Sequence, residues 1–314
     1  MRYIITLSFL GCLCLFIHSE AHAYPTYIAK GYATCATCHY APDGGAMPNA
    51  YGVATLQSLF PDTIESETIS ELRETLQKNL VMGKDFEENQ TFQWDMGLDT
   101  RMMMVFDHTS ENTRTLFFPM LAELQAVMAY GNYEVYGSIS ARKFGDSPSD
   151  LGVYSRHHWV KYQANANVSI RAGRMVLPFG IRIDDHTSYT RRDLGFDKHD
   201  HSYGIQLDYF KDNIALSAMA YGGNFIVGDP SRQKRGAALT FSYLMPAFSQ
   251  FGISLLGDAS QLTTRVMAGA FLRTKIYEKI YAMMETDFLH TKANNTPTSQ
   301  TEIVSFLRLG WFPW

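Results

Sequence analysis

From about residue 92 onward, apolar and polar residues alternate along the chain. In the stretch 133–144 (YEVYGSISARKF), Val135, Ile139 and Ala141 share one face, and polar side chains occupy the other. The stretches 264–275 (TRVMAGAFLRTK) and 279–288 (KIYAMMETDF) follow the same rule. A period of two over segments of this length predicts β-strands with one apolar and one polar face.

Turn residues divide this part of the chain into about twelve predicted strands. We place them at 92–106, 115–130, 133–144, 153–163, 167–176, 203–210, 214–221, 235–245, 250–258, 264–274, 279–290 and 302–314. Links after even-numbered strands are short, and most links after odd-numbered strands are longer, as in an outer-membrane barrel with an even number of strands. The alternative is a soluble β-sandwich. We predict a mainly β fold over 91–314, an antiparallel outer-membrane β-barrel of about 12 strands.

Two further features of this part of the chain agree with a barrel. The chain ends on an aromatic strand, LRLGWFPW, and five aromatic residues near strand ends could form interfacial girdles: Trp94, Tyr130, Trp159, Tyr243 and Trp311. The predicted inward faces carry many charges, at Arg101, Glu123, Arg142, Arg171, Glu285, Asp287 and Arg308. With twelve strands, both chain ends and the short turns would face the periplasm, and the longer loops would face outward.

The first 23 residues have the pattern of a secretory signal peptide. Arg2 precedes a short apolar run, and SEAHA ends the segment with small residues at Ala21 and Ala23. The run is shorter than the ~20 residues that span a bilayer as a helix. We therefore expect export with cleavage after residue 23. The formal net charge of −4 gives no basic field that would attract nucleic acid, so no nucleic-acid partner is expected.

Residues 24–90 have a different pattern, which predicts a small, mainly helical domain. Thr68 and Glu71 match a capping box, and Leu72, Leu76 and Leu80 follow at helical spacing. A unit of this size buries only a marginal core and is usually stabilised by a disulfide, a metal or a cofactor.

This segment contains the motif C-x-x-C-H at Cys35, Cys38 and His39, which are followed by no further cysteine. Covalent attachment of one haem c needs two thiols and an adjacent histidine, and the exported chain supplies all three. A zinc site would lack further cysteine ligands, a thioredoxin-like pair would lack its βαβ setting, and a chance occurrence is the remaining alternative. We favour haem, with His39 as the proximal iron ligand.

The second axial ligand of the iron is left open by the sequence. Met82 beyond the predicted helix is the first candidate, and Met47 in the loop after the motif is the second. A histidine or an open position are further alternatives. Methionine in this chain also serves ordinary core packing, since there are 15 of them.

The longest predicted outer loop, residues 178–202, is rich in carboxylates and imidazoles. Such groups bind iron, zinc or manganese, and the candidates are Asp184, Asp185, His186, Asp197, His199, Asp200 and His201. Arg191 and Arg192 lie among them and could balance their charge. We favour the simpler interpretation of a solvated loop rich in turn residues.

The combination of a signal peptide, one C-x-x-C-H motif and a barrel resembles the fused outer-membrane monohaem cytochrome–porins. The stretch CATCHYAPDGGAMPNAYG matches their motif at Pro42, Gly44, Gly45, Asn49, Tyr51 and Gly52, and AGRMVLPFGIRIDDHTSYTR resembles one of their barrel segments. The resemblance implies Cys35 and Cys38 as attachment sites and His39 as an axial ligand. The family includes proposed outer-membrane iron(II) oxidases, which we expect to have more strands.

The sequence therefore predicts an outer-membrane c-type cytochrome that transfers electrons through one haem on the periplasmic side of a porin-like barrel. Expected partners are outer-membrane lipid, periplasmic electron carriers and an extracellular donor or acceptor. One alternative is a channel whose haem unit is a redox-sensitive or structural plug. Another is an iron(II) oxidase. An electron carrier fits the motif better than a catalyst.

Overall fold

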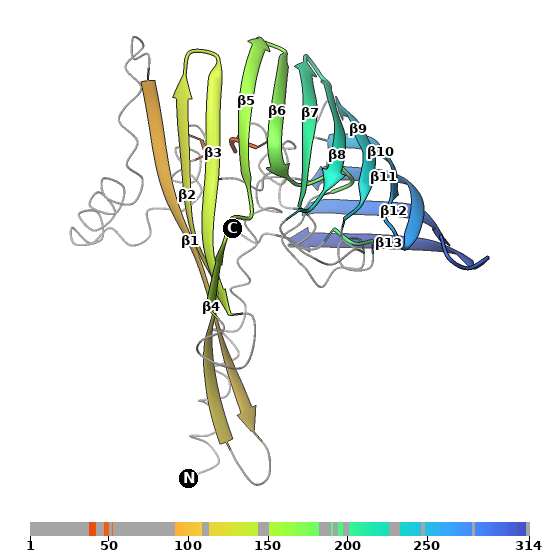
Figure 1. Ribbon diagram of the computed structural model, residues 1–314, viewed down its shortest axis with the longest axis horizontal. Coiled ribbons are helices and arrows are strands. Elements are labelled where there is room, and N and C mark those ends of the chain that lie inside the picture. Colours follow the sequence, from red (N-terminus) through yellow and green to blue (C-terminus); the bar gives the residue numbers. More distant parts are fainter. Residues whose placement is uncertain are drawn as a thin grey trace.

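The computed structural model describes residues 38–41, 47–49, 52, 92–108, 113–143, 151–181, 190, 194–196, 201–225, 233–245, 249–277 and 280–311. The predicted signal peptide (1–23) and most of the predicted helical domain (24–90) lie outside the described residues. In the described part of the chain, no helix is long and apolar enough to cross a membrane. From residue 92 onward the described residues are mostly strand (Figure 1).

Thirteen strands form one antiparallel sheet, in which most strands pair with their neighbours in the sequence. The strands are β1 (Phe92–His108), β2 (Thr113–Tyr130), β3 (Tyr133–Lys143), β4 (Leu151–Tyr154), β5 (His158–Asn165), β6 (Val168–Met175), β7 (Ser202–Lys211), β8 (Ile214–Gly223), β9 (Arg235–Met245), β10 (Ser249–Ala259), β11 (Thr263–Tyr277), β12 (Ile280–Ala293) and β13 (Ser299–Trp311). The prediction of a mainly β, antiparallel fold is confirmed, and most predicted strand bounds lie within a few residues of those observed.

The fourth predicted strand, 153–163, is the clearest difference from prediction. The structure divides it into β4 and β5, both of which pair with β3. Tyr154 lies opposite Ser140 and His158 lies opposite Gly137, so three residues oppose two, as in a β-bulge. The backbone amide of Ser138 donates to the carbonyl of His157 at 2.9 Å, which keeps the two strands joined at the bulge. The sheet thus has a continuous path of twelve strands, with β4 as an offset extension of β5.

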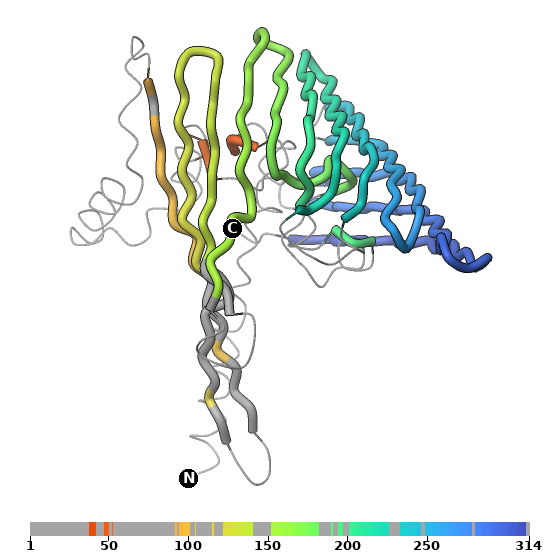
Figure 2. Tube along the Cα trace, viewed as in Figure 1, coloured from red at the N-terminus to blue at the C-terminus, as the bar shows by residue number. Residues whose placement is uncertain are grey.

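The direction of the strands turns progressively from β1 to β13, so that the sheet is strongly twisted (Figures 1 and 2). β1 and β13 are the two edge strands, and in the described residues they do not pair with each other. The structure therefore shows an antiparallel meander, as expected for the predicted order of strands, whereas its closure into a barrel belongs to the proposal below. Short turns, such as residues 131–132 and 212–213, alternate with longer links such as 176–201.

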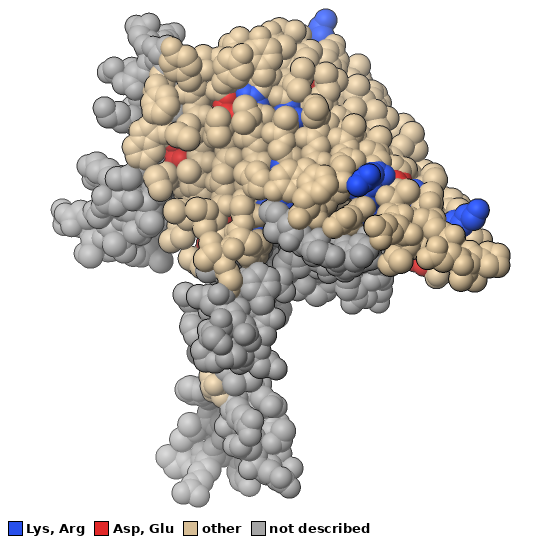
Figure 3. Space-filling view, viewed as in Figure 1, with Lys and Arg blue, Asp and Glu red and all other residues tan. Residues whose placement is uncertain are grey.

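The two faces of the sheet differ in chemistry. On β10, Phe251, Ile253 and Leu255 are exposed on one face, here called the outer face, whereas Ser254 and Asp258 are buried on the other, the inner face. The same alternation holds along β11 and β12. Figure 3 shows a face of the sheet on which charged side chains are sparse. Exposed apolar residues on a sheet this wide need a partner other than water.

Four of the five aromatic residues predicted for the interfacial girdles are exposed in the structure. Trp94, Tyr130, Tyr243 and Trp311 are exposed, as an outer girdle requires. The prediction is wrong for Trp159, because this residue is buried on the inner face and stacks on Tyr136 with ring centroids 5.2 Å apart. Trp159 occupies an inward position of β5, whose exposed large apolar residues are Val160 and Tyr162.

Candidate functional site on the inner face of the sheet

The pairing register places the inward side chains of β8 to β12 in rows that cross the strands. One row is apolar and consists of Met219, Ala238, Leu256, Met267 and Leu289. The next row towards the short turns is polar and consists of Ser217, Thr240, Ser254, Gly269 and Asp287. We call the second row the polar belt. The inner face therefore carries polar groups that need partners once water is removed.

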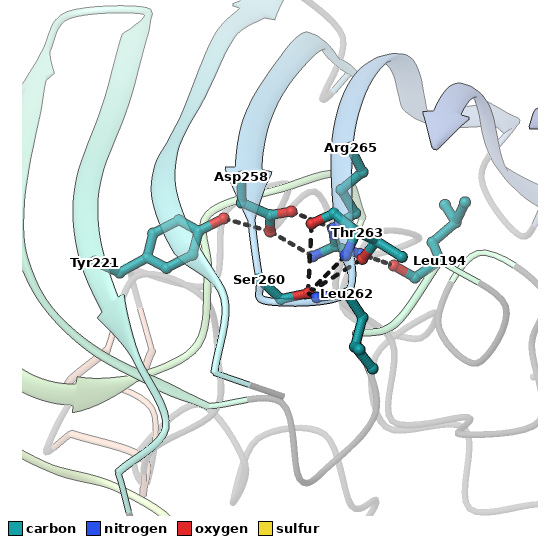
Figure 4. Close-up of polar contacts among 7 residues, drawn as sticks. All are labelled: Leu194, Tyr221, Asp258, Ser260, Leu262, Thr263 and Arg265. Atoms are coloured by element: carbon teal, nitrogen blue, oxygen red, sulfur yellow. Dashed lines mark hydrogen bonds and ion pairs between the residues drawn. The ribbon is translucent and has the colours of Figure 1, made fainter. Parts of the chain in front are cut away.

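A buried ion pair lies on the other side of the apolar row (Figure 4). Arg265 on β11 and Asp258 on β10 form two parallel hydrogen bonds, Nε to Oδ1 at 2.7 Å and Nη2 to Oδ2 at 2.8 Å. The Tyr221 hydroxyl also donates to Asp258 Oδ2 at 2.8 Å. This two-point geometry fixes the guanidinium plane and satisfies both carboxylate oxygens. The third arm of Arg265, Nη1, donates to the backbone carbonyl of Leu194 at 2.6 Å.

A second buried ion pair joins β6 to β7. Arg171 Nε donates to Asp208 Oδ2 at 3.1 Å, and both side chains are almost completely buried. Asp208 Oδ1 accepts from Gln206 at 2.7 Å and from the Ser217 hydroxyl at 2.6 Å. The guanidinium of Arg171 also lies over the ring of Trp159, 5.6 Å from its centroid. A buried charge with this many partners tolerates removal from water.

The long link between β6 and β7, residues 176–201, lies on the inner face in its described parts. Pro178 accepts a hydrogen bond from Thr240, Gly180 donates to Ser254, and both partners belong to the polar belt. Leu177, Phe179, Leu194 and Phe196 are buried in one cluster with the apolar row. The favoured prediction of a solvated outer loop over 178–202 is therefore wrong for residues 178–181 and 194–196. The apolar residues of VLPFGI and LGF were the signal in the sequence.

Gly180 permits the closest approach of this link to the wall. Its φ of +62° is left-handed, and a Cβ atom there would lie 1.6 Å from Glu285 Oε1. That same oxygen accepts the backbone amide of the next residue, Ile181, at 3.1 Å. Any larger residue at position 180 would therefore strain the backbone and displace the carboxylate that holds the link.

The predicted inward charges are largely where the alternation placed them. Glu123, Arg171, Glu285 and Asp287 are buried on the inner face, and Arg308 on β13 is half-buried at an inward position. The side chains of Arg101 and Arg142 lie outside the described residues. Alternation alone could not reveal their bonding, such as the 2.9 Å ion pair of Glu123 with Arg156 in the bulge.

The described part of the C-x-x-C-H segment also contacts the inner face. Residues 38–40 run antiparallel to residues 47–49, with a bridge between His39 and Pro48 and a 2.8 Å hydrogen bond from the Asn49 amide to the Cys38 carbonyl. The Tyr40 hydroxyl donates to Asp95 of β1. Burial and the nearby Asp95 carboxylate raise the pKa of Tyr40 above its usual range, so the phenol remains a donor. Asp95 lies opposite Val127, three residues before β2 ends at Tyr130, so this contact is near the short turn 131–132.

The described donors of this segment are of the kinds that a haem needs, a thiol at Cys38 and an imidazole at His39. Met47 is buried, and its Sδ lies 3.8 Å from the position that a Cβ on Gly97 would occupy. Its observed contact is therefore one of packing against Gly97 of β1. Cys35 and Met82 lie outside the described residues.

Of the seven predicted metal ligands of the loop 178–202, the structure describes only His201. Asp184, Asp185, His186, Asp197, His199 and Asp200 lie outside the described residues, and His201 is buried against His157. No group of three or more potential metal ligands is found among the described residues. His157 was not among the predicted site residues, and it lies in the bulge between β4 and β5, which alternation could not locate.

The fold and the inner face together define a twisted antiparallel meander with an apolar exposed outer face and a polar interior crossed by one of its own links. No family model and no curated protein matches the chain. Among solved structures it is similar to in-vitro folded OmpT, an outer membrane protein of Vibrio cholerae, with a TM-score of 0.41 and 8% identity over 71% of this chain and 84% of that chain. It is also similar to the outer membrane channel DcaP of Acinetobacter baumannii, with a TM-score of 0.41 and 11% identity over 68% and 79% of the two chains.

We expect Gly180→Ala to destabilise the protein more than Gly131→Ala does. Gly131 also has a positive φ, +56°, but a Cβ there would meet nothing within 4 Å. The difference between the two variants therefore isolates the displaced Glu285 carboxylate, whose hydrogen bond contributes about 1.5–3 kcal/mol, as is usual for a bond to a charged group. The free energy of unfolding, from urea titration of the refolded chain, measures it. Equal losses would mean that Glu285 does not hold the link.

Proposed function

We propose that the chain is an outer-membrane β-barrel that forms a porin-like passage narrowed by the link 176–201. The observation that carries the proposal is the chemistry of the two faces: exposed apolar side chains outside, and buried charged and polar side chains inside. Lipid is the solvent that suits the outer face, because every backbone group of a strand is already bonded within the sheet. The meander supports closure by pairing of β1 with β13.

The interior supports a narrow passage rather than a wide one. The link 176–201 is bonded to β9, β10, β11 and β12 through Thr240, Ser254, Arg265 and Glu285. A barrel of twelve strands is wider than a barrel of eight strands, whose interior can be filled by side chains alone. The folded-in link, together with the Tyr40 and Met47 segment on β1, would occupy part of the remaining space.

The lipid-facing part of the proposal predicts a depth-dependent cost of charge on the outer face. Leu255→Arg in the middle of β10 should lower the free energy of unfolding in lipid vesicles by about 2–4 kcal/mol. Phe251→Arg lies on the same strand and face, nearer the short-turn end, and should cost only about 0–1 kcal/mol. If this face contacts water instead of lipid, neither arginine should change the free energy of unfolding by more than about 0.5 kcal/mol, apart from the effect of lost packing.

The passage predicts ion conductance in planar bilayers by the refolded mature chain. Arg265→Gln removes the charge that holds both Asp258 and the Leu194 carbonyl, so the link should loosen and single-channel conductance should rise. Lys292→Gln, an exposed position on β12, removes the same charge without touching the link and should leave conductance unchanged. Absence of conductance in every preparation would contradict the channel.

Electron transfer through a covalent haem is the second candidate function, and the specific observation that favours it is the anchoring of the C-x-x-C-H segment. Tyr40 and Met47 hold residues 38–40 and 47–49 on the inner face of β1, near the short turns that would face the periplasm. A haem bound to Cys35 and Cys38 would supply a one-electron carrier there. His39 would be its proximal ligand, and the partner would be a periplasmic electron carrier, with an extracellular donor or acceptor at the other end. A haem at this mouth would also serve as the redox-sensitive plug of the alternative.

We expect haem staining and a pyridine haemochrome spectrum in the outer-membrane fraction, both lost in Cys35→Ala and Cys38→Ala. Met47→Leu should keep the covalent haem, because it removes no attachment site. External redox couples should then reduce and reoxidise the haem on a turnover timescale. A stained protein that no couple reduces or oxidises would contradict electron transfer, and conductance independent of haem redox state would contradict a gated plug.

A further inference from the structure

One buried arginine differs from the other buried arginines described above in having no carboxylate partner. Arg174, next to the last residue of β6, has only 3% of its surface exposed. The guanidinium groups of Arg171 and Arg265 pair with Asp208 and Asp258, whereas Arg174 forms no ion pair with any residue that the structure describes. A buried charge without a counter-charge is costly, and a bound anion would offset that cost.

The hydrogen bonds of Arg174 reproduce one half of those of Arg265. In Arg265, Nη1 donates to a backbone carbonyl, and Nε and Nη2 donate together to the Asp258 carboxylate (Figure 4). In Arg174, Nη1 likewise donates to a backbone carbonyl, that of Ser155. Its Nε atom is buried and has no hydrogen-bond partner among the described atoms. The side of the guanidinium that binds an oxyanion at two points in Arg265 thus has no acceptor on Nε in Arg174.

The bulge between β4 and β5 holds Arg174 in this orientation. Ser155, whose carbonyl accepts from Arg174, lies in the bulge. The Ser155 hydroxyl donates to the His157 carbonyl at 3.2 Å and lies 2.8 Å from Nδ1 of His158. A bulge turns backbone groups away from the regular ladder of the sheet. The guanidinium is therefore positioned by the backbone rather than by a counter-charge.

Arg174 lies on the outer face, at the end of the strands away from the short turns. The register places it opposite His158 of β5 and Tyr203 of β7. Ile170 of β6 and Ile205 of β7 are exposed, and alternation places Arg174 and Tyr203 on the same face as these two residues. A strand crosses the hydrocarbon core with about 9–11 residues, so the far end of the eight-residue β6 is close to the outer headgroup region.

Rings cover Arg174 on this face. The rings of His158 and Tyr203, which belong to the two strands flanking β6, have centroids only 5.3 Å apart and therefore meet over β6. Tyr203 in turn lies 5.5 Å from Phe225, which is 63% exposed. Aromatic residues gather at the headgroup level of a bilayer. The outer rim thus combines a buried cation with apolar rings, which suits a phosphorylated lipid headgroup.

We propose that Arg174 binds the phosphate group of a lipid headgroup in the outer leaflet of the outer membrane. The inference rests on the proposed barrel, because it needs the outer face to contact lipid. The phosphate oxygens accept from Nε and Nη2, a two-point contact for which the planar guanidinium is suited. The side chain of His158 moves aside to admit the headgroup, and Tyr203 and Phe225 pack against its apolar part.

The test is a titration of the refolded full mature chain in detergent micelles with diphosphorylated lipid A, followed by native mass spectrometry. The wild type should bind one lipid A. Arg174→Gln should bind it at least about tenfold more weakly, because two charge-assisted hydrogen bonds are lost. Arg174→Lys should recover only part of the affinity, because an ammonium group cannot make the two-point contact.

Arg235→Gln is the matched control. Arg235 begins β9 at the same end of the sheet and is exposed, so its replacement removes the same charge without removing a buried guanidinium. The affinity for lipid A should therefore remain that of the wild type.

Two ligand controls identify the bound group. Lipid A without its phosphates should bind the wild type no better than intact lipid A binds Arg174→Gln. A large excess of inorganic phosphate should not displace lipid A. Complete displacement would mean that the site binds the free ion, and it would overturn the lipid as the ligand.

The stability of the lipid-free chain distinguishes a ligand site from a structural ion pair. Arg174→Gln should lower the free energy of unfolding less than Arg265→Gln, which leaves Asp258 buried without its counter-charge. Equal losses, equal affinity of the wild type and Arg174→Gln for lipid A, or no binding by the wild type would each overturn the proposal. The Leu255→Arg and conductance measurements decide the barrel separately, so a chain that passes them and fails here overturns this inference alone.

Discussion

The architecture depends on one constraint, the burial of charge on the inner face of the sheet. Because side chains alternate between faces, every strand that exposes apolar residues outward must place its polar residues inward. Arg265 with Asp258, and Arg171 with Asp208, solve this by bidentate or multiply bonded pairing across neighbouring strands. Removal of one partner from such a pair leaves a buried charge and costs about 3–5 kcal/mol. Register, pairing and link position are therefore coupled.

The same constraint explains why the chain turns back into its own interior. Backbone groups of the link 176–201 supply hydrogen-bond partners to charged side chains of the inner face. The Leu194 carbonyl accepts from Nη1 of Arg265, and the Ile181 amide donates to Glu285. The apolar side chains of the link cover the row between these polar groups. At the β1 edge, the Tyr40 hydroxyl supplies a hydrogen bond to the Asp95 carboxylate. Under the proposed function, any solute or electron carrier in the lumen would meet these two inserted segments rather than the bare wall.

The strands were predictable because each face of the sheet has a constant environment along the strand, which imposes a period of two on the sequence. Trp159 was misplaced because an aromatic near a strand end suits either face, and only the stack on Tyr136 decides between them. The bulge at Ser155–His157 was missed because a single extra residue does not show in the alternation of apolar and polar residues. The link 176–201 was misjudged because its charged residues outnumber Phe179, Leu194 and Phe196, although those three residues are buried.

The bulge also decides whether the sheet can close. In a meander, strands alternate in direction, so the first and last are antiparallel only when the number of strands on the path is even. Thirteen independent strands would bring β1 and β13 together in parallel, without a hairpin-like register. Because β4 and β5 share β3 as partner, the path has twelve strands, and its two edges have the directions that antiparallel closure needs. The edge residues of β13, such as Ile303 and Leu307, are among the most exposed apolar residues of the described chain. An open edge of this kind invites pairing with another chain, and closure onto β1 removes it.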